Sequence, residues 1–136
     1  MVRVEIVYQG GLRCQATHAP SGNRIVTDAP VDNQGKGESF SPTDLMATSL
    51  GTCLLTIMGI VAQRHGVDLE GTTVTVEKLM VADPLRRVGR LEVRVSVPLP
   101  VSPADRTRLE HAARTCPVHQ SLDPRVERPI TFHWKG

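Results

Sequence analysis

The sequence predicts an α+β fold, with a single domain over residues 1–136. Its length suits one domain and leaves little room for two. Apolar residues make up 40% of the chain but aromatic residues only 3%, so the core must come mostly from aliphatic side chains. Hydrophobic periodicity gives the element order strands, helix, strands, helix, strand, which is typical of α+β domains.

The first 40 residues predict a small antiparallel meander followed by a loop. Alternation of apolar and polar residues, interrupted by turns at 9–11 and 21–23, is the pattern of half-buried strands. We expect strands over residues 2–8, 12–17 and 24–27. The polar, glycine-containing segment 29–40 is predicted to be a loop, and loops of this length in compact domains are often functional.

A long helix is predicted to begin at residue 41. Ser41 can cap it, Pro42 suits the first helical position, and Asp44 stands three residues after the cap. The helix is expected to run to about His65 and to stop at Gly66. Because it is apolar around most of its circumference, we expect it to be central and covered on several sides.

The rest of the chain predicts a hairpin, a second helix and a last strand. The hairpin strands are expected over 74–81 and 91–97, and the last strand over 130–134. Ser102 repeats the capping pattern and opens a helix that runs to about Arg114. The pair Cys116-Pro117 ends this helix or begins a new turn, because proline disfavours a helical residue before it.

Composition excludes several classes of partner. The net charge of +2, the absence of like-charge runs and the few aromatic rings argue against a nucleic-acid partner. The N-terminus is charged where a signal peptide would be apolar, and the uncharged segment 45–61 is short for a membrane span. We therefore expect a cytoplasmic protein without a membrane partner, in which three cysteines do not form a structural disulfide framework.

Two of the cysteines are candidates for chemistry. Cys53 lies on the predicted central helix and Cys116 at the end of the second helix. Taken alone, each is more often a buried structural thiol than a reactive one. The pair is of interest because both helices are expected to pack in one core.

Two motifs that hold these cysteines resemble the OsmC/Ohr family of peroxide-reducing proteins. They are SPTDL at 41–45 leading through SLGT at 49–52 to Cys53, and CPVH at 116–119, and the resemblance covers nearly the whole chain. It implies an intertwined homodimer with swapped sheet edges, in which central helices carry the first cysteine and active sites lie at the dimer interface. It also implies a thiol-dependent peroxidase of organic hydroperoxides that needs no cofactor.

The resemblance implies a role for each cysteine. Cys53 would be the peroxidatic thiolate, which attacks the peroxide and becomes a sulfenic acid. Cys116 would condense with it to form a disulfide, and a small or protein-bound dithiol would reduce that disulfide.

A thiolate on an apolar helix also needs a positive neighbour, because burial disfavours its charge. Cys53 lies too far from the helix start to benefit from the helix dipole. The family uses an arginine of the N-terminal sheet, and Arg13 stands at the matching place. The family's glutamate, ten residues before the first cysteine, is Thr43 here; Glu38 in the glycine-containing loop is the expected substitute, while capping explains Asp44.

Three alternatives remain open at the level of sequence. A zinc site could draw on Cys14, Cys53, Cys116 and His119, although a paired Cys-x-x-Cys is missing. A non-enzymatic relative could bind a small apolar ligand or a partner at the dimer cleft. A nucleophilic hydrolase would need a histidine base beside Cys53, and no motif supplies one. Cys14 follows Arg13 on a strand, so it is expected to point to the opposite face in a structural role.

Overall fold

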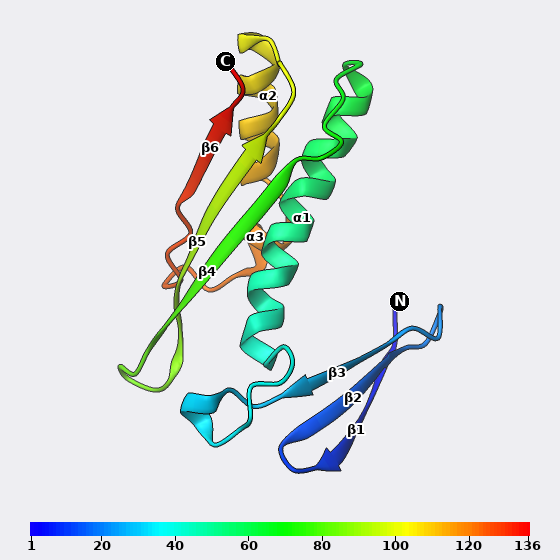
Figure 1. The fold of residues 1–136 in the computed structure, drawn as a ribbon, viewed down its shortest axis with the longest axis vertical. Coiled ribbons are helices and arrows are strands. Elements are labelled where there is room, and N and C mark those ends of the chain that lie inside the picture. Colours follow the sequence, from blue (N-terminus) through cyan, green and yellow to red (C-terminus); the bar gives the residue numbers. More distant parts are fainter. The chain divides into compact units, whose positions relative to one another are not determined.

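The computed structural model describes residues 1–136 and has the predicted α+β architecture (Figure 1). The chain divides into two compact units, residues 1–46 and 47–136, with the boundary inside the long helix. The elements in chain order are β1 (Val4–Gly10), β2 (Arg13–His18), β3 (Arg24–Asp28), a 3₁₀ turn (Val31–Asn33), α1 (Pro42–Arg64), β4 (Thr73–Val81), β5 (Arg87–Val97), α2 (Pro103–Arg114), α3 (Pro117–Ser121) and β6 (Ile130–Trp134).

The first unit holds the antiparallel meander β1–β2–β3, as predicted. Its register places Ile6, Ala16 and Ile25 side by side across one face, and Arg13 directly opposite Asp28 on the other. Apolar side chains on both faces are exposed: Val4, Ile6, Val7, Tyr8, Ile25 and Val26. This sheet therefore has no apolar core of its own within the chain.

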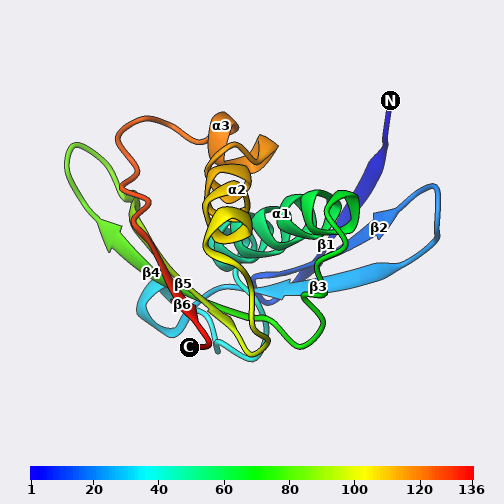
Figure 2. The same ribbon diagram turned by 90° about the horizontal axis from the view of Figure 1, so that it is seen from above.

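The second unit holds a sheet of order β4–β5–β6. β4 and β5 form the predicted antiparallel hairpin, whereas β5 and β6 run parallel and are connected through α2 and α3. Figure 2 shows α1 and α2 on the same side of this sheet. The core lies between these layers, and its fully buried members include Leu50, Leu54, Met58, Leu91, Val93, Val95 and Leu109.

Both ends of α1 agree with the sequence prediction. The Ser41 hydroxyl accepts the Asp44 N–H at 3.0 Å, while the Asp44 carboxylate accepts the Ser41 N–H at 2.9 Å, which is a complete capping box. After Arg64 the chain turns at Gly66, whose φ of +65° suits glycine. The Val67 N–H then donates to the Ala62 carbonyl at 2.9 Å and closes the helix.

The sequence predicts that α1 is buried on several sides, but in the structure of the single chain only part of its surface is fully buried. A single stripe that includes Leu50, Leu54 and Met58 is fully buried against the core. On the opposite side Thr52 and Thr56 are exposed, and their hydroxyls donate to carbonyls of the preceding turn. By length and composition alone α1 would also pass for a membrane span. Its threonines and its buried stripe instead fit a helix that packs along one side of a protein core.

The segment after α2 forms a further short helix, whereas the sequence predicts only a helix end or a new turn there. Ser102 caps α2 by accepting the Asp105 N–H at 3.2 Å, as predicted. Cys116 then caps α3, and its sulfur accepts the His119 N–H at 3.3 Å.

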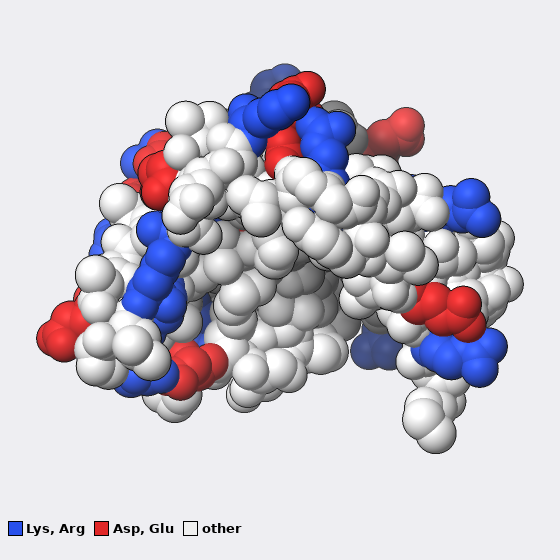
Figure 3. Space-filling view, turned by 90° about the horizontal axis from the view of Figure 1, so that it is seen from below, with Lys and Arg blue, Asp and Glu red and all other residues white.

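Charged side chains on the face in Figure 3 form small groups of both signs, separated by uncharged surface.

Candidate functional site

The structure brings Cys53 and Cys116 together in the second unit. Cys53 lies in the middle of α1, partly buried against the core, whereas Cys116 is fully buried at the start of α3. Both are free thiols, and the Cys53 side chain lies close enough to influence the pKa of Cys116. Two free thiols that lie near each other are candidates for a disulfide.

The surroundings of Cys116 favour its protonated form. Burial raises the pKa of the Cys116 thiol, and the neighbouring Cys53 side chain raises it further. The N–H groups of His119 and Val118 point at the sulfur and act in the opposite direction. Burial is the largest of these influences, so the balance favours the thiol form of Cys116.

A groove of about 550 Å³ is lined by α1 and α2. Its apolar lining includes Ile57 and Ile60, which lie on the same face of α1 as Cys53. On the other side it is lined by α2 as far as Thr115, the residue before Cys116. The rim carries four basic side chains: Arg64, His65, Arg108 and His111. Arg108 Nη1 lies 2.7 Å from Asp105 Oδ1, so the Arg108 charge is partly neutralised.

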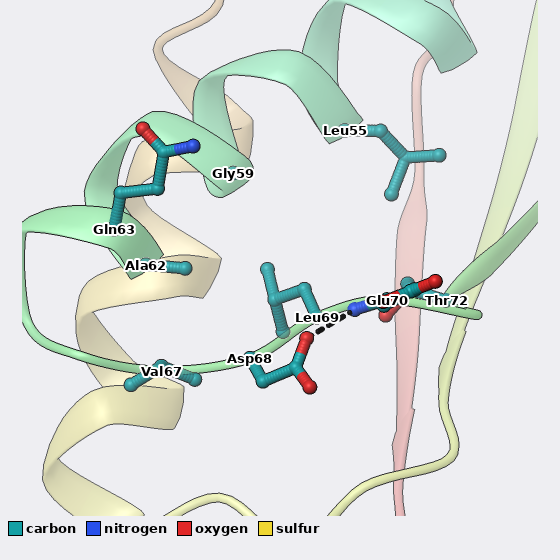
Figure 4. A pocket seen from close by; sticks show the side chains of 9 residues that line it. All are labelled: Leu55, Gly59, Ala62, Gln63, Val67, Asp68, Leu69, Glu70 and Thr72. Atoms are coloured by element: carbon teal, nitrogen blue, oxygen red, sulfur yellow. Dashed lines mark hydrogen bonds between the residues drawn. The ribbon is translucent and has the colours of Figure 1, made fainter.

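A second hollow, of about 360 Å³, lies between α1 and the segment that leads to β4 (Figure 4). Leu55 and Leu69 point into it, while Asp68 and Glu70 stand at its edge. The Asp68 carboxylate accepts a hydrogen bond from the Glu70 N–H at 2.9 Å, which stabilises the local turn. None of the predicted site residues lines this hollow, which separates it from the thiol pair.

The predicted cation and its predicted acid also meet, within the first unit. Arg13 Nη2 lies 3.4 Å from Glu38 Oε1. The same nitrogen lies 3.4 Å from Oδ2 of Asp28, which is only 1% exposed. The Glu38 N–H donates to Asp28 Oδ2 at 3.0 Å, so backbone and side chain of the loop residue both belong to this cluster.

Electrostatics keep Asp28 ionised despite its burial. The hydrogen bond from the Glu38 N–H is the largest influence that lowers the pKa of Asp28, and the charge of Arg13 lowers it further. Burial alone would raise that pKa, but the two donors outweigh it. Arg13 is thus held between a buried carboxylate and an exposed one.

Sequence reasoning missed Asp28 because the third strand was expected to end at residue 27. The strand continues by one residue, and the register then sets Asp28 directly across from Arg13. Extending the alternation of β3 and pairing it with β2 would have revealed a buried acid opposite the candidate arginine. At the family's glutamate position, Thr43 lies 3.3 Å from the Ser41 hydroxyl in the first turn of α1.

The sequence analysis also singled out Cys14 and His119. Cys14 pairs with Tyr8 and Thr27 across the sheet, on the face opposite Arg13, as expected. His119 contacts Cys116 through its backbone N–H, and burial lowers the pKa of its ring, helped by the charges of Arg128 and Arg114. The structure holds no group of three or more His, Cys, Asp or Glu side chains that could bind a metal ion.

Comparison with known proteins places this arrangement in a family. The model of the OsmC-like protein family matches residues 35–129, which includes α1 and both thiols. The chain belongs to the OsmC family. Among curated proteins, none matches.

Several solved structures share the fold over nearly the whole chain. A crystal structure from Psychrobacter arcticus 273-4, described provisionally as an osmotic stress induced and detoxification response protein, is 46% identical, with a TM-score of 0.93. It covers 98% of this chain and 96% of its own. Organic hydroperoxide resistance proteins named OsmC from Legionella pneumophila and OhrB from Bacillus subtilis are each 15% identical. The Legionella protein has a TM-score of 0.79, and the match covers 98% of this chain and 96% of that one. The Bacillus protein has a TM-score of 0.72, and the match covers 97% of each chain.

Proposed function

We propose that this OsmC-family protein is a thiol-dependent peroxidase that reduces organic hydroperoxides through Cys53 and Cys116. The observation that carries the proposal is the proximity of the two thiols, which interact electrostatically, together with a groove whose α1 wall is apolar. The description of two solved relatives as organic hydroperoxide resistance proteins supports the same class of substrate.

In the first step, the Cys53 thiolate attacks the outer oxygen of the hydroperoxide. The O–O bond breaks, the leaving alkoxide takes up a proton and departs as an alcohol, and Cys53 becomes a sulfenic acid. In the second step, Cys116 loses its proton and its sulfur attacks that of Cys53, which expels hydroxide and forms the disulfide. A small or protein-bound dithiol then supplies two electrons and restores both thiols.

The groove supports a preference for organic peroxides over hydrogen peroxide. Ile57, Ile60 and Val61 give it an apolar wall on the face of α1 that carries Cys53. An organic group that leaves water for this wall gains about 25 cal/mol per Å² of apolar surface, whereas hydrogen peroxide has no such surface to bury. The preference therefore follows from binding of the organic part and not from the reacting oxygen atoms.

In this proposal Arg13 stabilises the Cys53 thiolate. A cation is required because Cys53 lies about three turns into α1, beyond the reach of the helix dipole. Asp28 and Glu38 both contact the guanidinium, each at 3.4 Å from Nη2.

We further propose that a second copy of the chain covers the β1–β2–β3 sheet in a homodimer. The row Ile6, Ala16 and Ile25 forms part of an apolar surface, and Ile6 is 65% exposed. Surfaces of this kind on a small protein are typical of interfaces. The compartment that suits free thiols and a dithiol reductant is the cytoplasm.

The test is consumption of cumene hydroperoxide in the presence of dithiothreitol. Cys53→Ser is expected to abolish consumption, a loss of at least about 10³-fold, because the nucleophile is gone. Cys116→Ser is expected to leave a sulfenic acid on Cys53 that a dimedone-type reagent traps. Cys14→Ser, a matched change outside the site, is expected to react like wild type.

Equally slow consumption by wild type and Cys53→Ser would overturn the enzymatic proposal. The result would favour a non-enzymatic role in which the groove binds a small apolar ligand, because neither cysteine lines the groove.

A further inference from the structure

The two carboxylates on Arg13 differ in how firmly the fold holds them. Both lie 3.4 Å from the same nitrogen, Nη2. Asp28 is buried, with 1% of its side chain exposed, whereas 57% of the Glu38 side chain is exposed. One guanidinium is thus shared between a carboxylate of the sheet and a carboxylate of a loop.

Asp28 is fixed from several directions. It is the cross-strand partner of Arg13, its Oδ2 accepts the Glu38 N–H at 3.0 Å, and its own N–H donates to the Phe40 carbonyl at 3.0 Å. Its second oxygen, Oδ1, is buried without a hydrogen-bond partner. An asparagine would fill the same volume and accept the same N–H, so the property that only aspartate adds is its negative charge. That charge faces Arg13, the cation that it contacts.

Glu38 is held far more loosely. Its carboxylate reaches Arg13 from the loop between β3 and α1 and remains largely in water. Exposed ion pairs contribute only about 0–1 kcal/mol, so another anion can take the place of Glu38 on the guanidinium. Removal of Arg13 from Asp28 would instead leave a buried charge without a partner, which is strongly unfavourable.

The charges of the cluster also conflict with a purely supportive role for Glu38. Two carboxylates on one guanidinium leave a net charge of −1, formed by Arg13, Asp28 and Glu38. A cation that stabilises a thiolate must offer positive charge, and it offers more once the exposed carboxylate has moved away.

We propose that Asp28 is the positioning residue of Arg13, and that Glu38 is a displaceable counter-ion that leaves when Arg13 engages the Cys53 thiolate. The inference rests on the proposed function. Glu38 then does not orient Arg13, as the sequence analysis expects; it competes with the Cys53 thiolate for the guanidinium. Asp28 then takes the orienting role that the family's glutamate has elsewhere, while the matching position here is Thr43.

The test follows Cys53 by two measurements, the rate of its oxidation by cumene hydroperoxide in a single turnover and the pH profile of its alkylation by iodoacetamide. Peptide mass spectrometry separates Cys53 from the other thiols. Asp28→Asn is expected to slow oxidation about 10- to 100-fold, the effect of a misplaced catalytic group, and to move the alkylation profile to higher pH. Glu38→Gln is expected to speed oxidation about two- to fivefold and to move the profile to lower pH.

Two controls show whether Asp28 acts through Arg13. Glu5→Gln removes an exposed acid of the same sheet that pairs with Arg3 at 3.2 Å, and it is expected to change neither measurement. In an Arg13→Ala background, Asp28→Asn is expected to cause no further loss, because the residue through which it acts is already gone. Should Asp28→Asn fail to fold, Asp28→Glu serves instead; it keeps the charge, moves it by one methylene, and is expected to slow oxidation only when Arg13 is present.

Wild-type rates in Asp28→Asn, or an undiminished loss in the Arg13→Ala background, would overturn the positioning role. A loss in Glu38→Gln as large as that in Asp28→Asn would show that Glu38 orients Arg13 and is not displaced. The alkylation profile needs no peroxide, so it decides these points even if the wild-type protein consumes none. Failure of the proposed peroxidase function and failure of this inference are therefore distinguishable.

Discussion

The sheets β1–β2–β3 and β4–β5–β6 each have three strands, but only the second has a core. In residues 47–136 the sheet buries Leu91, Val93 and Val95 against helices. In residues 1–46 the buried residues are Asp28 and Ser41, both polar, while Ile6 is exposed to water. Hydrophobic burial is the main favourable contribution to folding, so the second unit carries the stability of the isolated chain.

The proposed site residues are divided in the same way as the core. The thiols belong to the second unit, and the Arg13 guanidinium belongs to the first unit, where Asp28 and Glu38 contact it. The exposed apolar residues of the first unit are typical of a surface that another molecule covers. A second copy of the chain is the occupant that we propose.

The largest expected effect on stability is in the second unit. Leu54→Ala removes a fully buried side chain and should lower the free energy of unfolding by about 3 kcal/mol, through lost burial and a residual cavity. Leu85→Ala, at a position 77% exposed on the β4–β5 hairpin, should change it by less than about 0.5 kcal/mol. Urea unfolding measures both, and similar values for the two variants would contradict the assignment of the core.

A charge on the first sheet probes what covers it. Ile6→Asp should shift a homodimer toward monomer, because a carboxylate would be buried in the interface without a partner. Leu85→Asp places the same charge at an exposed apolar position of the other unit and should leave the assembly unchanged. Sedimentation velocity reports the molecular mass, and a monomeric wild type or a dimeric Ile6→Asp would argue against the second copy.

The thiol pair should respond to pH in a defined direction. The raised pKa of Cys116 means that its thiolate fraction grows about tenfold per pH unit below that pKa, so disulfide closure should accelerate as pH rises. Rapid mixing with cumene hydroperoxide, followed by sulfenic acid trapping at pH 6, 7 and 8, would measure the lifetime of the intermediate. A lifetime independent of pH would show that another step limits closure.

The smallest effect is expected at Asp28 in acid. The folded state lowers the pKa of Asp28, so its contribution to stability is present above the usual aspartate value of about 3.9 and is lost as pH falls toward the lower, folded value. Pepsin cleavage of segment 1–46 relative to 47–136 should increase between pH 4 and pH 2. Asp28→Asn should raise the pH 4 ratio and flatten this dependence; an unchanged profile would place the acid-sensitive contact elsewhere.

Local signals in the sequence predicted much of the fold. The capping pairs at Ser41 and Ser102 and the stop at Gly66 were confirmed because they depend on residues within one or two turns. The parallel pairing of β5 and β6 was not predicted, because it joins residues that are distant in the sequence. The short helix α3 was missed because five residues are too few for a periodic pattern.

The candidate site was predictable to a smaller extent. No spacing rule links Cys53 to Cys116, and their pairing was expected only from the family resemblance. The contact of Arg13 with Asp28 depends on strand register, which the turn at residues 19–23 sets. A shift by one residue would move Asp28 to the other face of the sheet, so its role could not be read from composition or from a motif.

Peroxide-dependent mass spectrometry of the thiols would show whether Cys53 and Cys116 form a redox pair. After one equivalent of cumene hydroperoxide, we expect the loss of two hydrogen atoms and a peptide pair joined by a Cys53–Cys116 disulfide, both reversed by dithiothreitol. Cysteines that remain fully alkylatable after peroxide, or a disulfide that involves Cys14, would rule out this redox pair.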